Sequence, residues 1–350
     1  MTEEFNSTPE SQPTPEPTHA PYPQDHDGLL RNQFAPVAPV ASAVERIKTE
    51  VSKVVIGQHE HIELLLIGLL SGGHVLVEGL PGVAKTLLAK TVARTLNCGF
   101  QRIQFTPDLM PTDITGTGVL DAKNADFRFR KGPIFSNIIL IDEINRSPAK
   151  TQAALMEVME EKQLTYDGVT YKMEFPFLVI ATQNPVEQEG TYALPEAQLD
   201  RFMFRLKMGY PTPEQEEKIL MRFASDFENR QLQTVEQVID SAALRSFVSV
   251  IEQVHIRPEL VKYIADIVCL TRQTGDLFLG ASPRASLTIL KSSKTLAAIR
   301  GRDFVTPDDI RTVCYPVLNH RLILSHEREM EGTTTEDIIA TVIEQIEVPR

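Results

Sequence analysis

The chain has 350 residues, of which 42% are hydrophobic and 23% are charged, and its formal net charge is −12. This composition predicts a soluble protein of about two folded units. The apolar run at Leu64–Leu70 is too short to cross a bilayer, and the lack of a lysine and arginine block argues against nucleic acid as the main partner.

The N-terminal segment differs from the rest of the chain. Its first 28 residues carry six acidic residues and no lysine or arginine, and eight of the 23 prolines lie within the first 39 residues. Such a segment cannot bury enough apolar surface to fold, so we predict a disordered acidic tail over residues 1–40. It has no basic-then-apolar secretion signal, and the three widely spaced cysteines fit reduced core thiols. We therefore expect a cytoplasmic protein without membrane insertion.

Residues 41–210 alternate between strand-like and helix-like segments. Two helices are predicted first, at Ala41–Val55 and from Glu60 to Leu70. Five strands are then predicted from apolar runs, at His74–Glu78, Phe100–Phe105, Ile138–Asp142, Phe177–Thr182 and Phe202–Lys207. This alternation predicts an α/β fold in which a mostly parallel five-stranded sheet is covered by helices on both faces, an αβα sandwich.

A phosphate-binding loop is predicted directly after the first strand. The loop and the residue that follows it are Gly79, Leu80, Pro81, Gly82, Val83, Ala84, Lys85, Thr86 and Leu87. Strand, glycine-containing loop, Lys-Thr and helix is the order of a P-loop, whose N–H groups surround phosphates. Lys85 would reach the β- and γ-phosphates, and Thr86 would place its hydroxyl on Mg²⁺. Ala84 replaces the usual glycine, and we expect it to adopt the right-handed geometry of a helix start. The alternative is an ordinary strand-to-helix turn.

A second acidic motif supports ATP binding. The apolar run Ile138–Ile141 is typical of a strand buried on both faces, and it ends in Asp142 and Glu143. Buried carboxylates are costly unless a metal or hydrogen bonds satisfy them. We expect Asp142 to hold Mg²⁺ through water and Glu143 to polarise the attacking water.

Two hairpins are predicted as insertions into this plan. One covers residues 117–131, with a polar turn at Asp121–Asp126 and period-2 alternation after it. The other covers residues 163–173 and has an Asp-Gly turn between β-forming residues. They are either surface decoration or loops that face a partner or a pore.

Three further polar residues suit an ATPase. Asn184 follows a buried-type strand and could orient the attacking water, although a turn residue before proline is the simpler interpretation. Arg201 precedes the last strand, where it could reach a neighbouring subunit's γ-phosphate or only pair with Asp200. Arg284 lies in the first turn of a helix, where the helix dipole disfavours a cation. It would contact a nucleotide held between the sheet domain and its lid, or be solvent-exposed.

From Pro211 onward the pattern is helical. Thr212, Ser282 and Thr306 each precede a proline at a predicted first helical position. These signals predict a small all-α lid domain over residues 211–335, with a C-terminal helix or tail over residues 336–350.

The quoted motifs together resemble an AAA+ ATPase of the MoxR family, in the helix-2-insert group, over residues 40–335. The matching segments are Gly79–Thr86, Arg102–Leu109, Asp113–Gly116, Lys131–Phe135, Asp142–Arg146, Leu194–Phe202 and Ala281–Arg284. The resemblance implies ATP and Mg²⁺ as ligands, with Lys85 and Thr86 as Walker A and Asp142 and Glu143 as Walker B. It further implies that Asn184 is sensor 1, Arg201 the arginine finger and Arg284 sensor 2. Ile56, Gly57 and Gln58 would line the adenine end.

The resemblance also implies a biological role. Such proteins form homo-oligomeric rings, typically hexamers, and act as chaperone-like ATPases that remodel or activate partners. Those partners often carry a von Willebrand factor A domain. Two alternatives stay open from the sequence: a nucleic-acid motor of the same AAA+ group, and a scaffold that uses ATP only to assemble.

Overall fold

The computed structural model describes residues 35–80, 82–121, 126–184, 192–224 and 231–349. Residues 1–34 of the predicted acidic tail, residue 81 of the predicted P-loop and residues 122–125 of the first predicted hairpin lie outside these residues. The first helix, α1 (Ala38–Ser52), begins before the predicted boundary at residue 41. Among the described residues, no helix is both long and apolar enough to cross a membrane.

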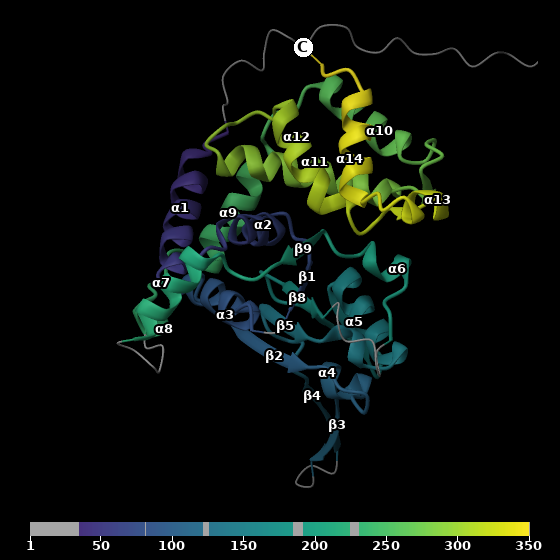
Figure 1. Ribbon diagram of the computed structural model, residues 1–350. Coiled ribbons are helices and arrows are strands. Elements are labelled where there is room, and N and C mark those ends of the chain that lie inside the picture. The colour runs from purple at the N-terminus through teal and green to yellow at the C-terminus, as the bar shows by residue number, and fades with distance from the viewer. Residues whose placement is uncertain (1–34, 81, 122–125, 185–191, 225–230, 350) are drawn as a thin grey trace, which may run out of the picture. The chain divides into compact units, whose positions relative to one another are not determined.

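A five-stranded parallel sheet forms the centre of the chain (Figure 1), and its strand order is β2-β5-β8-β1-β9. The strands are β1 (Val75–Gly79), β2 (Phe100–Gln104), β5 (Ile138–Asp142), β8 (Leu178–Gln183) and β9 (Phe204–Met208). All five predicted strands are present; the bounds of β5 agree with the prediction, and no strand end differs by more than two residues. The order places β8 between β5 and β1, so the ends of these three strands lie next to one another.

Alternate residues of the central strands face two different cores, because side chains of a strand point to opposite faces. On β5, Ile138 and Leu140 belong to one core, whereas Ile139 and Ile141 belong to the other. The first core is covered by α1, α2 (His59–Leu70) and α3 (Lys85–Thr95), and the second mainly by α4 (Pro111–Thr115) and α5 (Ala149–Glu161) (Figure 1). The predicted αβα sandwich is confirmed.

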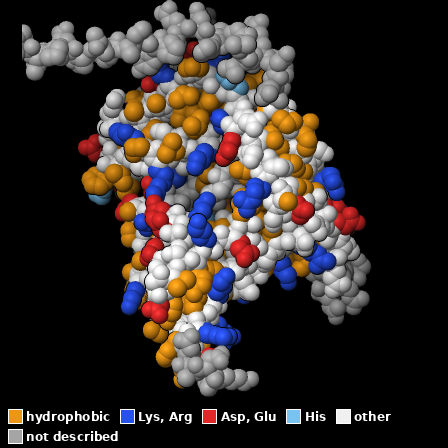
Figure 2. Space-filling model, turned by 180° about the vertical axis from the view of Figure 1, so that it is seen from behind, with side chains coloured by type: hydrophobic (Ala, Val, Ile, Leu, Met, Phe, Trp, Pro, Cys, Tyr) orange, Lys and Arg blue, Asp and Glu red, His pale blue; other side chains and the backbone are white. Residues whose placement is uncertain are grey.

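Both predicted hairpins are present, and they contact each other. β3 (Gly116–Asp121) pairs with β4 (Asp126–Lys131), and β6 (Gln163–Tyr166) pairs with β7 (Val169–Lys172). The ring of Phe129 on β4 stacks on Tyr166 with a centroid distance of 4.7 Å, and it lies 4.8 Å from the ring of Tyr171. Hydrophobic side chains gather on the part of the molecule that carries β3 and β4 (Figure 2), where Leu120 is 56% exposed.

The C-terminal part is a helical lid, as predicted. Thr212, Ser282 and Thr306 each cap a helix by accepting a hydrogen bond from a backbone N–H of its first turn. A short antiparallel ribbon that the helical pattern does not predict, β10 (Leu277–Leu279) with β11 (Ile323–Leu324), joins two lid segments.

The remaining helices are divided between the two parts of the chain. Before β9 lie η1 (Ile144–Arg146) and α6 (Glu196–Leu199). After β9 lie α7 (Pro213–Phe223), α8 (Gln231–Thr234), α9 (Ser241–Glu252), α10 (Pro258–Leu270), α11 (Pro283–Ile299), α12 (Pro307–Leu318), α13 (His326–Met330) and α14 (Thr335–Gln345).

Candidate active site

The predicted P-loop residues line a pocket at the carboxyl ends of the parallel strands. β1 ends at Gly79 and α3 begins at Lys85, as the motif requires. The Lys85 Nζ donates a hydrogen bond to the Gly79 carbonyl at 2.8 Å. Leu80 packs against the apolar core, and Pro81 lies outside the described residues. The pocket measures about 410 Å³ and is lined by Gly82, Val83, Ala84, Lys85, Thr86, Leu87, Arg102, Asp142, Glu143 and Asn184.

The backbone of Ala84 differs from expectation. Its φ of 62° and ψ of 23° lie in the left-handed region, not in the right-handed geometry expected of a helix start. The chain must reverse sharply between β1 and α3, and the residue before the helix takes up that turn. A left-handed alanine costs roughly 1–2 kcal/mol relative to the right-handed form, so the loop carries strain that glycine would avoid.

Asp142, at the end of β5, is held from two sides. Its Oδ2 accepts hydrogen bonds from Nε and Nη2 of Arg102, at 3.1 and 2.7 Å, and its Oδ1 accepts one from the Thr182 hydroxyl at 2.6 Å. Arg102 lies on the neighbouring strand β2, and sequence reasoning missed it. The sequence placed it only in the matching segment Arg102–Leu109 and gave it no role.

Glu143 has an unusual backbone and a fixed side chain. Its φ of 58° and ψ of 54° are left-handed, and its N–H donates to the Thr182 hydroxyl at 3.0 Å. Its Oε2 accepts a hydrogen bond from Gln104 at 2.8 Å and lies 3.2 Å from the Nε of Arg146. Strained backbone at a polar cleft is typical of functional residues. Sequence reasoning missed Gln104 as well.

Asn184 directly follows β8 and lines the same pocket, where it is 7% exposed. Because β8 lies between β5 and β1, the strand order places Asn184 between the phosphate loop and the two acids. The predicted sensor is therefore in the position from which an amide could orient a water molecule.

The residues present fit magnesium. The hydroxyl of Thr86 and the carboxylate of Asp142 line one pocket, and both are hard oxygen ligands. Within the described ranges no three His, Cys, Asp or Glu side chains form a cluster that could hold a metal by themselves. Mg²⁺ usually binds through one or two protein oxygens together with waters and substrate phosphates, which is the donor set that this pocket supplies.

The residues predicted to contact adenine lie elsewhere. Ile56 and Gly57 line a separate pocket of about 440 Å³, together with Ser52, His59 and the α7 residues Gln215, Lys218, Met221 and Arg222. Gln58 is the residue before α2 and does not line this pocket. Gly57 has a φ of 78°, a backbone conformation that favours glycine, and a Cβ there would lie 2.4 Å from the flexible end of the Gln215 side chain.

The two predicted arginines come together in a third pocket. Arg201 and Arg284 line a cavity of about 300 Å³ that shares no lining residue with the P-loop pocket. Both contact the carboxylate of Glu160, from Nε of Arg201 at 2.7 Å and from Nη2 of Arg284. These interactions, with the Arg201 hydrogen bond first, lower the pKa of the Glu160 carboxyl. The rest of the lining is Ser71, Gly72, Gly73, His74, Met159, Lys162, Asp200, Met203, Leu287, Thr288, Lys291 and Arg321.

This geometry corrects one sequence-based expectation and excludes one alternative. The lid does not bring Arg284 to the P-loop of its own chain, because helix α11 packs beside the arginine pocket instead. Arg201 does not pair with Asp200, since Asp200 is occupied by Arg321 at 2.7 Å and Arg201 by Glu160.

Comparison with known proteins identifies the family. The ATPase family associated with various cellular activities (AAA) matches residues 74–204, and the AAA lid domain matches residues 269–342. Chaperone MoxR1 of Mycobacterium tuberculosis is 41% identical over 343 residues, which cover 95% of this chain and 88% of that protein. The chain belongs to the MoxR family of AAA+ ATPases.

Two further relatives agree with this assignment. Protein MoxR of Methylorubrum extorquens is 30% identical over 331 residues, covering 88% of this chain and 95% of its own. A solved structure of a candidate ATPase from Cytophaga hutchinsonii has a TM-score of 0.83 and 42% identity, and covers 90% of this chain and 97% of its own. This MoxR-family chain is an ATPase with an AAA domain and a helical lid.

Proposed function

We propose that this ATPase hydrolyses ATP between copies of the chain and uses the reaction to remodel or activate partner proteins. The observation that carries the proposal is the separation of two pockets. The P-loop pocket holds the groups that bind phosphate and activate water, whereas Arg201 and Arg284 line a different pocket. We infer from this separation that the two arginines complete a site on another copy.

Each residue has one role in this scheme. Lys85 attracts the β- and γ-phosphates, and Thr86 and Asp142 would hold Mg²⁺, which neutralises phosphate charge. Glu143 accepts a proton from the attacking water while Asn184 orients that water. Arg201 and Arg284 of the adjoining copy stabilise the charge that develops on the γ-phosphate, an effect worth about 10³–10⁵ in rate for an arginine finger. The adenine would extend from the P-loop pocket toward the separate pocket lined by Ile56 and Gly57, which Gln58 does not line.

The wider role rests on the relatives and on the hairpins. The name of the M. tuberculosis relative describes a chaperone, which supports a client protein as the target. We propose a cytoplasmic hexameric ring whose β3–β4 hairpin, with exposed Val119, Leu120 and Phe127, contacts the client. A protein with a von Willebrand factor A domain is the proposed partner.

The activity is tested with Glu143→Gln, which keeps the size of the side chain and removes its basicity. This variant should bind Mg·ATP with wild-type affinity by calorimetry and hydrolyse it at least about 100-fold more slowly. The control Glu157→Gln, at an exposed position on α5, should keep the wild-type rate. Wild-type turnover by Glu143→Gln would contradict the assignment.

The action of these arginines at the P-loop of an adjoining copy is tested by mixing two inactive variants. Arg201→Ala keeps its own P-loop, and Lys85→Ala keeps its arginines. A mixture should therefore regain activity wherever the P-loop of an Arg201→Ala copy contacts the arginines of a Lys85→Ala copy. No recovery would contradict the scheme. The ATP-bound Glu143→Gln protein, used as bait, should retain a von Willebrand factor A partner that Lys85→Ala does not retain.

A further inference from the structure

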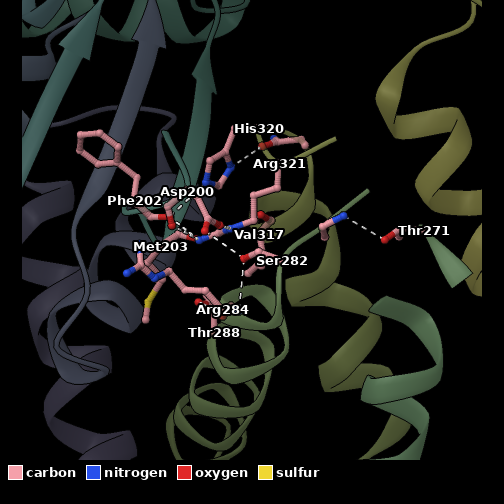
Figure 3. Close-up of polar contacts among 12 residues, drawn as sticks. Asp200, Phe202, Met203, Thr271, Ser282, Arg284, Thr288, Val317, His320 and Arg321 are labelled. Atoms are coloured by element: carbon pink, nitrogen blue, oxygen red, sulfur yellow. Dashed lines mark hydrogen bonds and ion pairs between the residues drawn. The ribbon is translucent and has the colours of Figure 1, made fainter. Parts of the chain in front are cut away.

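The loop that carries Arg201 is shaped by a buried arginine of the lid. Arg321 follows α12, and its side chain is only 2% exposed. It donates from Nη2 to the carbonyls of Asp200 and Phe202, at 3.1 and 2.6 Å, and from Nη1 to the carbonyl of Met203 at 3.2 Å. Three of the four carbonyls in residues 200–203 thus bind one guanidinium (Figure 3).

Every N–H of this guanidinium has an acceptor. The Nε donates to Oδ1 of Asp200 at 2.7 Å, and Nη1 also donates to the Val317 carbonyl. A guanidinium has five N–H donors in a fixed planar arrangement, and here five acceptors meet them. The neighbouring His320 adds an interaction between Nε2 and the Phe202 carbonyl at 3.0 Å. The contacts go mostly to backbone, so they fix the path of the loop and not a particular side chain.

Asp200 links this loop to the second arginine. Its Oδ2 accepts a hydrogen bond from the Ser282 hydroxyl at 2.9 Å. The same hydroxyl accepts from the Arg284 N–H at 3.2 Å and caps α11. Asp200 therefore connects the loop that carries Arg201, the next residue in the chain, to Ser282 and Arg284 at the start of α11, and Figure 3 shows Asp200, Ser282 and Arg284 side by side.

We propose that Arg321 is the positioning residue that, through Asp200 and Ser282, holds Arg201 and Arg284 as one unit for the phosphate of an adjoining copy. Arg321 contacts no substrate; it acts through the arginine pair, and the proposal rests on the function proposed above. The lid thereby controls the geometry of a site on another copy, and movement of α11 or α12 would move both arginines together.

The test is Arg321→Lys, which keeps the charge and cannot supply five planar donors. ATP affinity should be unchanged, and hydrolysis should fall about 100-fold, the size of effect expected when a catalytic group is misplaced by about 1 Å. Mixing with Lys85→Ala should restore hydrolysis, because Lys85→Ala copies present intact arginine pairs to the P-loops of Arg321→Lys copies. Amide exchange of a peptide over residues 199–204 should quicken.

The matched control is Arg302→Lys, which weakens a different buried ion pair of the lid. Arg302 donates to Asp309 from Nη1 at 2.7 Å and from Nη2 at 2.6 Å, and its other hydrogen bonds go to Phe304 and Thr306 within the lid. This control should leave hydrolysis and exchange of residues 199–204 at wild-type values even where its melting temperature falls.

Two outcomes would overturn the proposal. Unchanged exchange of residues 199–204 in Arg321→Lys would show that this arginine does not fix the loop, whatever the oligomer does. Arg321→Lys could also lose hydrolysis that Lys85→Ala does not restore, under conditions where Lys85→Ala does restore Arg201→Ala. This result would show that the substitution damages the fold in general and not the position of the arginine pair. If Lys85→Ala also fails to restore Arg201→Ala, the proposal that the arginines act on another copy is refuted. The amide exchange rates of residues 199–204 then test the role of Arg321 by themselves.

Discussion

Arg102 occupies the carboxylate that we assign to magnesium. Its guanidinium donates twice to Oδ2 of Asp142, so it competes with a metal ion, or with a metal-bound water, for that oxygen. Arg102→Gln should therefore lower the Mg²⁺ concentration needed for half-maximal binding of a fluorescent ATP analogue, by about fivefold, because a half-exposed ion pair of this kind contributes about 1 kcal/mol. The control is Arg128→Gln on the β3–β4 hairpin. An unchanged Mg²⁺ midpoint would show that Arg102 does not compete with the metal.

The roles of single residues could be predicted from sequence only where a motif fixes them. Asp142 and Glu143 lie at the end of a strand that the apolar pattern already locates, and Lys85 and Thr86 begin the helix that the loop motif places after β1. Arg102 and Gln104 were missed because their function depends on pairing of β2 with β5, which sets Gln104 opposite Asp142. That register is a tertiary property. The left-handed backbone of Ala84 likewise follows from closure of the loop and not from the alanine itself.

At the scale of elements, the two hairpins behave as one unit because Phe129 lies between Tyr166 and Tyr171. Aromatic pairs of this kind contribute about 0.5–1.5 kcal/mol beyond their buried area. Phe129→Ala should therefore speed amide exchange in β6 and β7, on a hairpin that does not contain the substitution. Leu120→Ala, at an exposed position on β3, should leave that exchange unchanged. Equal exchange in both variants would mean that the hairpins move independently.

The elements themselves were largely predictable, and their contacts were not. Asp-Gly between β-forming residues identified the second hairpin, and the Thr-Pro and Ser-Pro pairs identified three lid helices. The β10–β11 ribbon joins segments more than 40 residues apart and has two or three residues a strand, too short for a periodic signal. The packing of α11 beside the arginine pocket also depends on tertiary contacts, which is why the sequence did not separate Arg284 from the P-loop pocket.

At the scale of the whole molecule, His74 makes stability depend on pH. It is 4% exposed; its Nδ1 accepts from the Val179 N–H and its Nε2 lies 3.0 Å from the Met159 carbonyl. Burial lowers the pKa of His74 from 6.5 to about 4. Between these values the unfolded chain binds more protons than the folded one, so stability is lost as the pH falls.

The expected loss through His74 is about 3 kcal/mol of unfolding free energy between pH 7.5 and 4. Denaturant unfolding across this range should show a slope against pH that is smaller by about one proton in His74→Asn than in the wild type. His59→Asn, at an exposed position on α2, is the control. Parallel slopes in wild type and His74→Asn would contradict the assigned pKa.

The separate P-loop and arginine pockets restrict how copies can assemble. In a two-fold symmetric dimer residue i contacts residue j and j contacts i, so such a dimer could complete two sites only if the P-loop pocket and the arginine pocket lay on one contact patch. A head-to-tail contact sets the arginine pocket of one copy against the P-loop pocket of the next. An open chain of this kind leaves an unpaired P-loop pocket at one end and an unpaired arginine pocket at the other. Such a chain stops growing only by closing on itself, and a single copy whose contact angle is altered would turn a closed circle into an open filament.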